Sequence, residues 1–224
     1  IVLDPQGNAT MGSGIDKRDL QASVYEVLLG SKTIAEARIH AEAGKYDLLP
    51  ANRDLAGAEI ELVDMDHRET RLRDALQLVA SEYDFVLIDC PPALNLLTLN
   101  GLCAARSVMI PMQCEYYALE GLSDLVNTIR KVRANLNPEL EIEGLLRTMF
   151  DPRNALALQV SEQLLEHFGD KVYRTMIPRN VRLAEAPSYG VPVLYHDKLS
   201  KGTQAYLALA GELMNNAAQP AATA

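Results

Sequence analysis

Two aspartates stand where apolar runs end. Asp4 follows Ile1–Leu3, and Asp89 follows the unbroken apolar run Phe85–Ile88. A continuous apolar run without alternation indicates a strand buried on both faces, which is typical of a parallel sheet covered by helices. Ligands of such sheets collect at the carboxyl ends of the strands. We therefore expect both carboxylates at one sheet edge, where a ligand binds.

Asp89 has the position of a metal-holding carboxylate. An aspartate that ends an apolar strand is the Walker B arrangement, which holds Mg²⁺, usually through water, beside the phosphates of a nucleotide. Pro91 and Pro92 then turn the chain away, since proline fixes φ and lacks an N–H group. The alternative is a helix cap or a turn carboxylate, because many apolar strands end in aspartate.

A polar loop follows the first run. Gly7 is able to adopt a backbone conformation that other residues avoid, and Gln6 and Asn8 have side chains suited to orienting water or phosphate. The alternative for Asp4 is a simple Asp-Pro turn. The two acidic strand ends support each other without identifying a substrate.

Helix and strand patterns alternate along the chain. We predict helices within residues 19–30, 54–65, 67–83, 116–136 and 155–168, and strands within 45–52, 83–92, 106–112, 142–150 and 190–195. In the third helix, Leu72, Leu76 and Val79 share a face. The alternation predicts an α/β fold with a doubly wound, mostly parallel sheet and helices on both faces. We expect one domain over residues 1–214 and a disordered polar tail over residues 215–224.

Charge is unevenly distributed. The net charge of -9 argues against nucleic-acid binding over the whole surface. Residues 1–100 hold 9 basic and 17 acidic side chains, whereas residues 170–202 hold six basic and three acidic ones, a net of +3. We expect any DNA contact there, from Arg179, Arg182, Lys198 and Lys201; the alternative is that they form salt bridges. No stretch is apolar and long enough to span a membrane, so we expect no membrane contact.

Several blocks of sequence carry a family resemblance. They are "DPQGNAT", "YDFVLIDCPPALNLLTLNGL", "PMQCEYYALEGL", "TMFDPRNALALQV", "IPRNVRLAEAPSYGVPV" and "KGTQAYLALAGEL", in this order. Together they resemble the ParA/Soj chromosome-partitioning or plasmid-partitioning ATPases, within the deviant-Walker-A group that also contains MinD. The resemblance runs from residue 1 to about residue 214.

The resemblance implies a P-loop ATPase that uses ATP and Mg²⁺ and dimerises around two ATP molecules. It implies non-specific DNA binding, stimulation by a ParB-type partner, and a cytoplasmic, nucleoid-associated location. Asp4 matches the carboxylate that assists the attacking water or the metal, and Asp89 matches the Walker B carboxylate. Gln6, Gly7 and Asn8 match the first switch loop. Pro178 and Asn180 match contacts to the adenine.

Two departures from the family pattern matter. Val2 stands where relatives often carry another aspartate. The glycine-rich loop ending in Gly-Lys-Thr or Gly-Lys-Ser is absent from the 224 residues. The resemblance therefore implies that the first strand and the P-loop helix, a unit of roughly 30 residues, are missing. Because that loop supplies most phosphate contacts, we expect this chain to bind ATP poorly and to lack ATPase activity.

Two other functions stay open. One is a MinD-like, membrane-anchored cell-division ATPase; against it, the C-terminal stretch "GELMNNAAQPAATA" has no basic amphipathic pattern. The other is a non-catalytic fragment that acts by pairing with intact copies. Tyr116 and Tyr117 have no basic neighbour in sequence, so we expect core or interface packing rather than a platform for stacking bases.

Overall fold

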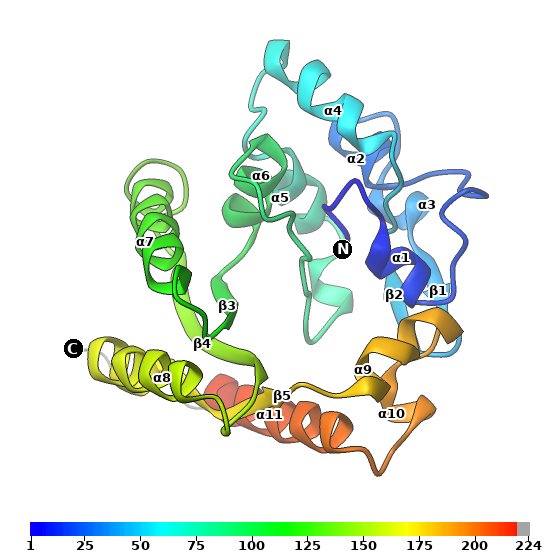
Figure 1. Cartoon of the computed structure of the whole chain (residues 1–224). Helices are drawn as coiled ribbons and strands as arrows, with labels where there is room; N and C mark the ends of the chain where they lie inside the picture. The colour runs from blue at the N-terminus through cyan, green and yellow to red at the C-terminus, as the bar shows by residue number, and fades with distance from the viewer. Residues whose placement is uncertain (219–224) are drawn as a thin grey trace. The chain divides into compact units, whose positions relative to one another are not determined.

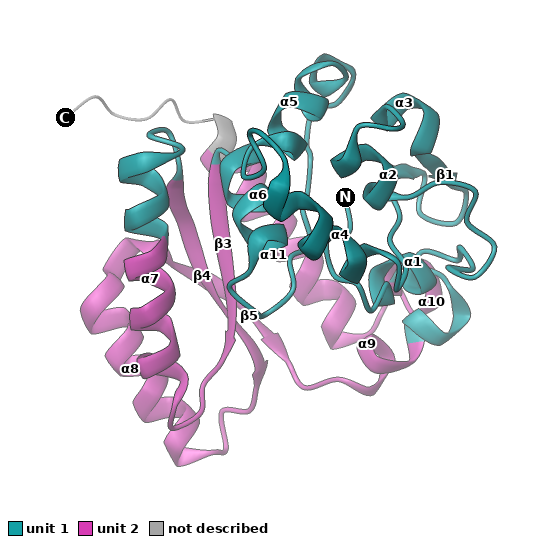
Figure 2. Ribbon diagram, turned by 90° about the horizontal axis from the view of Figure 1, so that it is seen from above, with its two compact units in different colours: residues 1–106, 129–140, 186–192 teal, residues 107–128, 141–185, 193–224 magenta. Residues whose placement is uncertain are grey.

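The computed structural model describes residues 1–218, which form two compact units (Figure 2). Unit 1 comprises residues 1–106, 129–140 and 186–192; unit 2 comprises residues 107–128, 141–185 and the chain from 193 onward. The single domain over residues 1–214 stays a prediction.

Unit 1 consists of short helices, a β-hairpin and the paired N-terminal segment. Its elements are α1 (Asn8–Gly12), α2 (Val24–Leu29), α3 (Ile34–Ala37), β1 (Ile39–Ala41), β2 (Tyr46–Leu48), α4 (Leu55–Glu61), α5 (Arg71–Gln77), α6 (Leu96–Ala104), and the 3-10 helices η1 (Leu62–Asp64), η2 (Ala80–Glu82) and η4 (Ala186–Tyr189). Ser23 and Thr33 open α2 and α3 with capping boxes, and Gly30 ends α2 in the left-handed conformation.

The predicted helices of unit 1 form, in shorter pieces. Leu72 and Val79 are buried in the core, and Leu76 packs against it, so the shared face of the third predicted helix is confirmed. Asn100 of α6 is fully buried. Its side chain accepts a hydrogen bond from the Leu72 N–H (3.1 Å) and donates to the Arg68 carbonyl (2.7 Å), which joins α6 to the start of α5.

The segment before Asp89 differs from its prediction. Residues 84–88 form no regular strand, and Phe85 and Leu87 are 60% and 78% exposed. The prediction of a strand buried on both faces is wrong for this structure. The physical reason is that the segment pairs along one edge only, with residues 1–3, and no helix of the described chain covers Leu87.

Unit 2 contains a parallel three-stranded sheet in the order β3-β4-β5. Its elements, including α7, which continues into unit 1, are β3 (Ser107–Gln113), α7 (Ala118–Asn135), β4 (Glu141–Phe150), α8 (Ala155–Phe168), η3 (Gly169–Lys171), β5 (Val172–Pro178), α9 (Val181–Glu185), α10 (Val193–His196) and α11 (Lys201–Ala218). Figure 1 shows the strands with α8 and α11 beside them.

Helices cover both faces of this sheet. Neighbouring residues of β4 point to opposite faces. Leu146 packs in a cluster with Leu209 of α11, whereas the next side chain, Arg147, donates a hydrogen bond to Ser161 of α8 (2.8 Å). The α/β class with a parallel sheet flanked by helices is therefore confirmed.

One strand of unit 2 was missed, and two predictions for the C-terminal part of the chain need correction. The strand β5 was not predicted, because Arg174 and Thr175 interrupt its apolar pattern. The predicted strand over residues 190–195 is wrong: Pro192 cannot donate to a ladder, and Val193–His196 form a helical turn. The predicted tail begins too early, since α11 continues to Ala218; its remainder, residues 219–224, lies outside the described residues.

Candidate functional site

Asp4 and Asp89 lie at the ends of neighbouring parallel segments. Val2 pairs with Asp89; the Leu3 N–H donates to the Asp89 carbonyl (2.7 Å), and the Asp89 N–H donates to the Ile1 carbonyl (2.9 Å). On its other side, the Val2 N–H donates to the Leu49 carbonyl (3.0 Å). The structure therefore brings the two predicted carboxylates to one edge, in unit 1.

The two carboxylates influence each other. Loss of solvation beside the surrounding chain raises the pKa of Asp89, although the residue is exposed, and the negative charge of Asp4 raises it further. Within the described part of the chain, no donor binds the side chain of Asp89. A divalent cation relieves this kind of like-charge repulsion, and Mg²⁺ at nucleotide sites takes one or two carboxylates together with phosphates and water. The donor set fits Mg²⁺ in that role, although no described group of three acidic, cysteine or histidine side chains forms a complete metal site.

The loop after Asp4 is a fixed turn. The Asp4 carboxylate accepts the Gln6 N–H (2.9 Å), and the Asp4 carbonyl accepts the Gly7 N–H (2.9 Å). Gly7 has φ 60°, so its predicted left-handed backbone is confirmed. A Cβ atom at Gly7 would lie 2.5 Å from the Ala51 carbonyl oxygen, so glycine is required there. Gln6 and Asn8 are exposed, which leaves their side chains accessible to a ligand.

Two residues that the sequence analysis missed hold this loop. Thr10 is buried in α1; its hydroxyl donates to the Ala51 carbonyl and accepts the Ala51 N–H, both at 3.0 Å. The Lys17 ammonium donates to the Gln6 carbonyl. Gln6 and Lys17 are 11 residues apart, and no pattern in the sequence connects them.

An apolar cavity of about 370 Å³ lies beside the Asp89 segment in unit 1. Its lining includes Leu76, Val79, Phe85 and Leu87. At its polar part, Tyr83 donates a hydrogen bond to Asp47 (2.7 Å). The many apolar side chains make it unsuited to phosphate, so we do not assign the nucleotide to it.

The two predicted adenine residues lie in unit 2. Pro178 ends β5, where it pairs with Phe150 of β4. The Asn180 side-chain oxygen accepts the N–H groups of Arg182 (2.9 Å) and Leu183 (3.4 Å), so it caps the start of α9. The capping role leaves the Asn180 side-chain NH₂ group as the donor that can meet a ligand.

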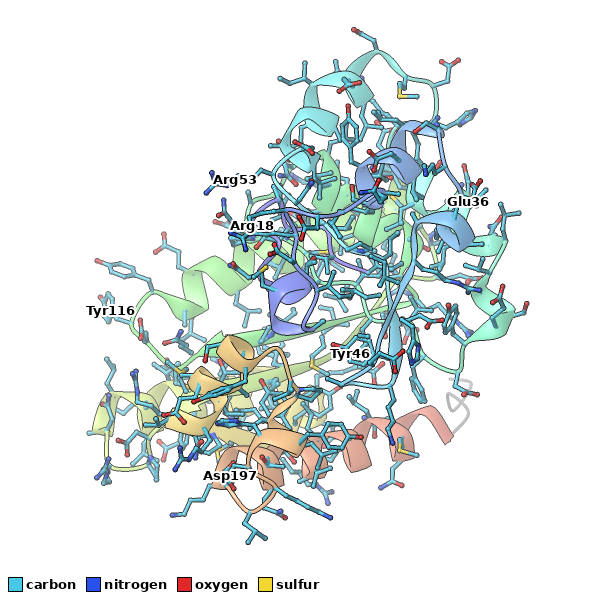
Figure 3. All side chains as sticks on the ribbon, turned by 90° about the vertical axis from the view of Figure 1, so that its right-hand side faces the viewer. Arg18, Glu36, Tyr46, Arg53, Tyr116 and Asp197 are labelled. Carbon is cyan, nitrogen blue, oxygen red and sulfur yellow. The ribbon has the colours of Figure 1, made fainter. Side chains whose placement is uncertain are left out.

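The predicted DNA-binding residues fall into two groups. Arg182 forms ion pairs with Glu185 (2.8 Å) and Asp197 (3.3 Å), as the salt-bridge alternative expects; Figure 3 labels Asp197. Arg179, Lys198 and Lys201 are exposed and form no ion pair with another described residue.

Tyr116 and Tyr117 are both 74% exposed, and their rings meet edge to face at 5.0 Å. Figure 3 shows Tyr116 projecting from the ribbon. Core packing is therefore excluded for this pair, and interface packing stays a prediction. Among the described residues, no helix has the length and apolarity needed to cross a membrane.

The comparisons with known proteins agree with this geometry. A family model described as an AAA domain matches residues 1–142. The chromosome partitioning protein ParA of Myxococcus xanthus is 53% identical over 214 residues, which cover 96% of this chain and 76% of that protein. The sporulation initiation inhibitor protein Soj of Bacillus subtilis is 52% identical over 216 residues, which cover 96% of this chain and 85% of that protein.

A solved structure is similar over nearly the whole chain. It is the cobyrinic acid a,c-diamide synthase from Mycobacterium smegmatis with a bound ATP analog and magnesium, 37% identical with a TM-score of 0.86, covering 97% of this chain and 82% of that one. The parallel sheet and its flanking helices place the chain in the class of P-loop NTPases. Within that class, the chain belongs to the ParA/Soj family of chromosome-partitioning ATPases.

Proposed function

We propose that this protein is an ATP-dependent DNA-partitioning switch. In the proposed cycle, an ATP-bound homodimer binds DNA non-specifically in the cytoplasm, on the nucleoid, and a ParB-type partner stimulates hydrolysis. The observation that carries the proposal is that Asp4 and Asp89 end neighbouring parallel segments, beside a loop in which Gly7 has a positive φ. The chain is also 52% identical to Soj.

The residues have separate proposed roles at the nucleotide. Asp89 would hold Mg²⁺, and Asp4 would orient the attacking water or the metal. Mg²⁺, when bound, neutralises charge on the phosphates. Gln6 and Asn8 supply polar side chains beside the γ-phosphate, and Gly7 lets the backbone approach it. Pro178 and Asn180 contact the adenine.

Exposure and charge support the proposed DNA surface. Arg179, Lys198 and Lys201 are exposed cations in a net-positive stretch, and phosphate contacts of this kind need no base-specific geometry. We keep Arg182 in this surface, because an arginine in a surface ion pair can exchange a carboxylate for a phosphate at small cost.

Salt-dependent DNA binding tests the proposal. In the full-length protein with ATP and Mg²⁺, the double variant Arg182→Ala, Lys201→Ala is expected to reduce the slope of log affinity against log salt by about 2, roughly one for each lost phosphate contact. Lys131→Ala, which removes an exposed charge on α7, is the matched control and should leave the slope unchanged. An unchanged slope in the double variant would remove these positions from the DNA surface.

A non-catalytic interaction role is the second candidate. It applies to a polypeptide limited to these 224 residues, which contain no Gly-Lys-Thr or Gly-Lys-Ser loop. Calorimetric titration with ATP and Mg²⁺ separates the two functions. Heat of binding that depends on Asp89 supports the ATP-driven switch, whereas pairing with intact copies without any nucleotide binding supports the interaction role.

A further inference from the structure

Lys17 binds a backbone carbonyl although carboxylates flank it in the sequence. It lies in the charged run Asp16-Lys17-Arg18-Asp19, yet its ammonium donates to the carbonyl of Gln6 rather than to a flanking carboxylate. Asp16 is occupied by Arg18, whose guanidinium meets it at 2.5 and 2.9 Å. Those hydrogen bonds lower the pKa of Asp16 to about 2. The charge of Lys17 is therefore directed to the loop after Asp4.

The contacts of Lys17 fix one peptide group. The peptide between Gln6 and Gly7 donates its N–H to the Asp4 carbonyl (2.9 Å), while its C=O accepts from the Lys17 ammonium. The side chain of Lys17 also packs against this peptide, since a Cβ atom at Gly7 would lie 3.0 Å from the Lys17 Cδ. The neighbouring Gln6 N–H binds the Asp4 carboxylate itself (2.9 Å).

We propose that Lys17 is a positioning residue for Asp4. By holding the Gln6 carbonyl, it keeps the Gln6 N–H directed at the Asp4 carboxylate, and so orients that carboxylate toward the edge that it shares with Asp89. Lys17 acts through the loop and touches no reacting atom. This inference rests on the proposed function, because it assigns Lys17 to the same metal and nucleotide site.

Loss of the Lys17 charge and loss of the Asp4 orientation have opposite expected effects on cation binding, so a Lys17 variant tests the proposal. Removing a positive charge near two carboxylates should tighten the binding of a divalent cation. Losing the orientation of Asp4 should weaken it. We therefore compare Lys17→Met, which keeps the length of the side chain, with Lys17→Arg, which keeps the charge and the donor. The control is Lys32→Met, which removes an exposed cation elsewhere in unit 1 and leaves the Arg18–Asp16 pair intact.

Two readouts on the isotope-labelled chain test the proposal. One is the affinity for Mn²⁺ alone, from paramagnetic broadening of the Gln6, Gly7 and Asn8 amides. The other is hydrogen exchange of the Gly7 amide without metal. For Lys17→Met we expect roughly five- to tenfold weaker Mn²⁺ binding and about tenfold faster exchange at Gly7, as the loss of one charge-assisted hydrogen bond implies. Lys17→Arg should keep both near the values of the unsubstituted chain, and Lys32→Met should change neither.

The outcomes distinguish a failure of the proposed metal site from a failure of the positioning role of Lys17. If Mn²⁺ does not broaden these amides in the unsubstituted chain, the proposed metal role of Asp4 and Asp89 fails, while exchange at Gly7 still tests the contact from Lys17. Unchanged exchange together with equal or tighter Mn²⁺ binding in Lys17→Met overturns the positioning role. If Lys17→Met does not fold, Lys17→Gln, which keeps an N–H donor without the charge, is measured in its place with the same criteria.

Discussion

At the scale of single residues, the site is built from groups that restrain one another. Asp4 is held by the N–H groups of its own loop, whereas the Asp89 carboxylate has no donor in the described chain. A neighbouring like charge raises the pKa of a carboxyl group, and Asp4 has this effect on Asp89. A bound cation would therefore relieve the repulsion between the two carboxylates.

Asp89→Asn should stabilise the protein at neutral pH. The pKa of the Asp89 carboxyl is raised by loss of solvation first and by the charge of Asp4 second. A carboxyl with a raised pKa stabilises the fold below its unfolded pKa, near 3.9, and that contribution is lost as pH rises through the folded pKa. The gain in Asp89→Asn is thus expected at pH 7 and should shrink toward pH 4.

Urea unfolding of both forms at the two pH values measures this effect. Asp84→Asn, at an exposed aspartate of the same segment, is the control. Equal gains in Asp89→Asn at pH 4 and pH 7 would show that the ionised carboxylate is not the cause.

At the scale of elements, α1 is packed against η4 through glycines. Gly14 and Gly190 both have positive φ, and their backbones touch: a Cβ atom at Gly190 would lie 2.7 Å from the Gly14 Cα. Nearby, Gly12 faces Pro187 at ordinary distance, with 3.5 Å between a Cβ atom at Gly12 and the Pro187 Cβ. Gly14 and Gly190 therefore approach closely, whereas Gly12 and Pro187 are in ordinary van der Waals contact.

Gly190→Ala should therefore cost stability, and Gly12→Ala should cost little. At Gly190 the new methyl group meets backbone that cannot move aside, and an alanine at φ 64° adds conformational strain. We expect about 1–3 kcal/mol of destabilisation for Gly190→Ala. For Gly12→Ala we expect a change within about 0.5 kcal/mol. Chemical denaturation of the two variants measures the difference, and comparable losses in both would contradict this account of the contact.

At the scale of the whole molecule, the net charge and its distribution along the chain limit which polyanions the protein binds. The chain is acidic overall, with a net charge of -9, while residues 170–202 carry a net of +3. Long-range attraction to a polyanion is therefore weak, and DNA contact depends on local cations that salt screens readily.

A polypeptide of these 224 residues is expected to show no measurable ATP turnover. It holds the two carboxylates, but it contains no Gly-Lys-Thr or Gly-Lys-Ser loop to bind the β- and γ-phosphates. Phosphate release, with and without a ParB-type partner and DNA, measures turnover. A polypeptide extended at its N-terminus to include such a loop is the positive control. Stimulated turnover by the 224-residue polypeptide itself would refute the expectation.

The sequence was sufficient where a local pattern had a local cause. Gly30 ends α2 where the helix predicted within residues 19–30 ends, the strand predicted within residues 142–150 lies in β4, and the loop after Asp4 has a glycine at position 7. Composition and periodicity were also enough for the α/β class. The ability of Gly7 to adopt a positive φ belongs to glycine itself, so it was predictable without the fold, whereas the close approach of Ala51 was not.

Tertiary structure decided whatever depends on partners distant in sequence. Phe85–Ile88 has the composition of a buried strand, yet whether it is buried depends on what lies on its second edge. The strand β5 forms because β4 offers a partner, although its own pattern is mixed. Thr10 and Lys17 gain their roles from the Ala51 and Gln6 backbones. Hydrogen bonds and burial between distant segments are properties of the folded chain, because a one-dimensional pattern does not encode which surfaces meet.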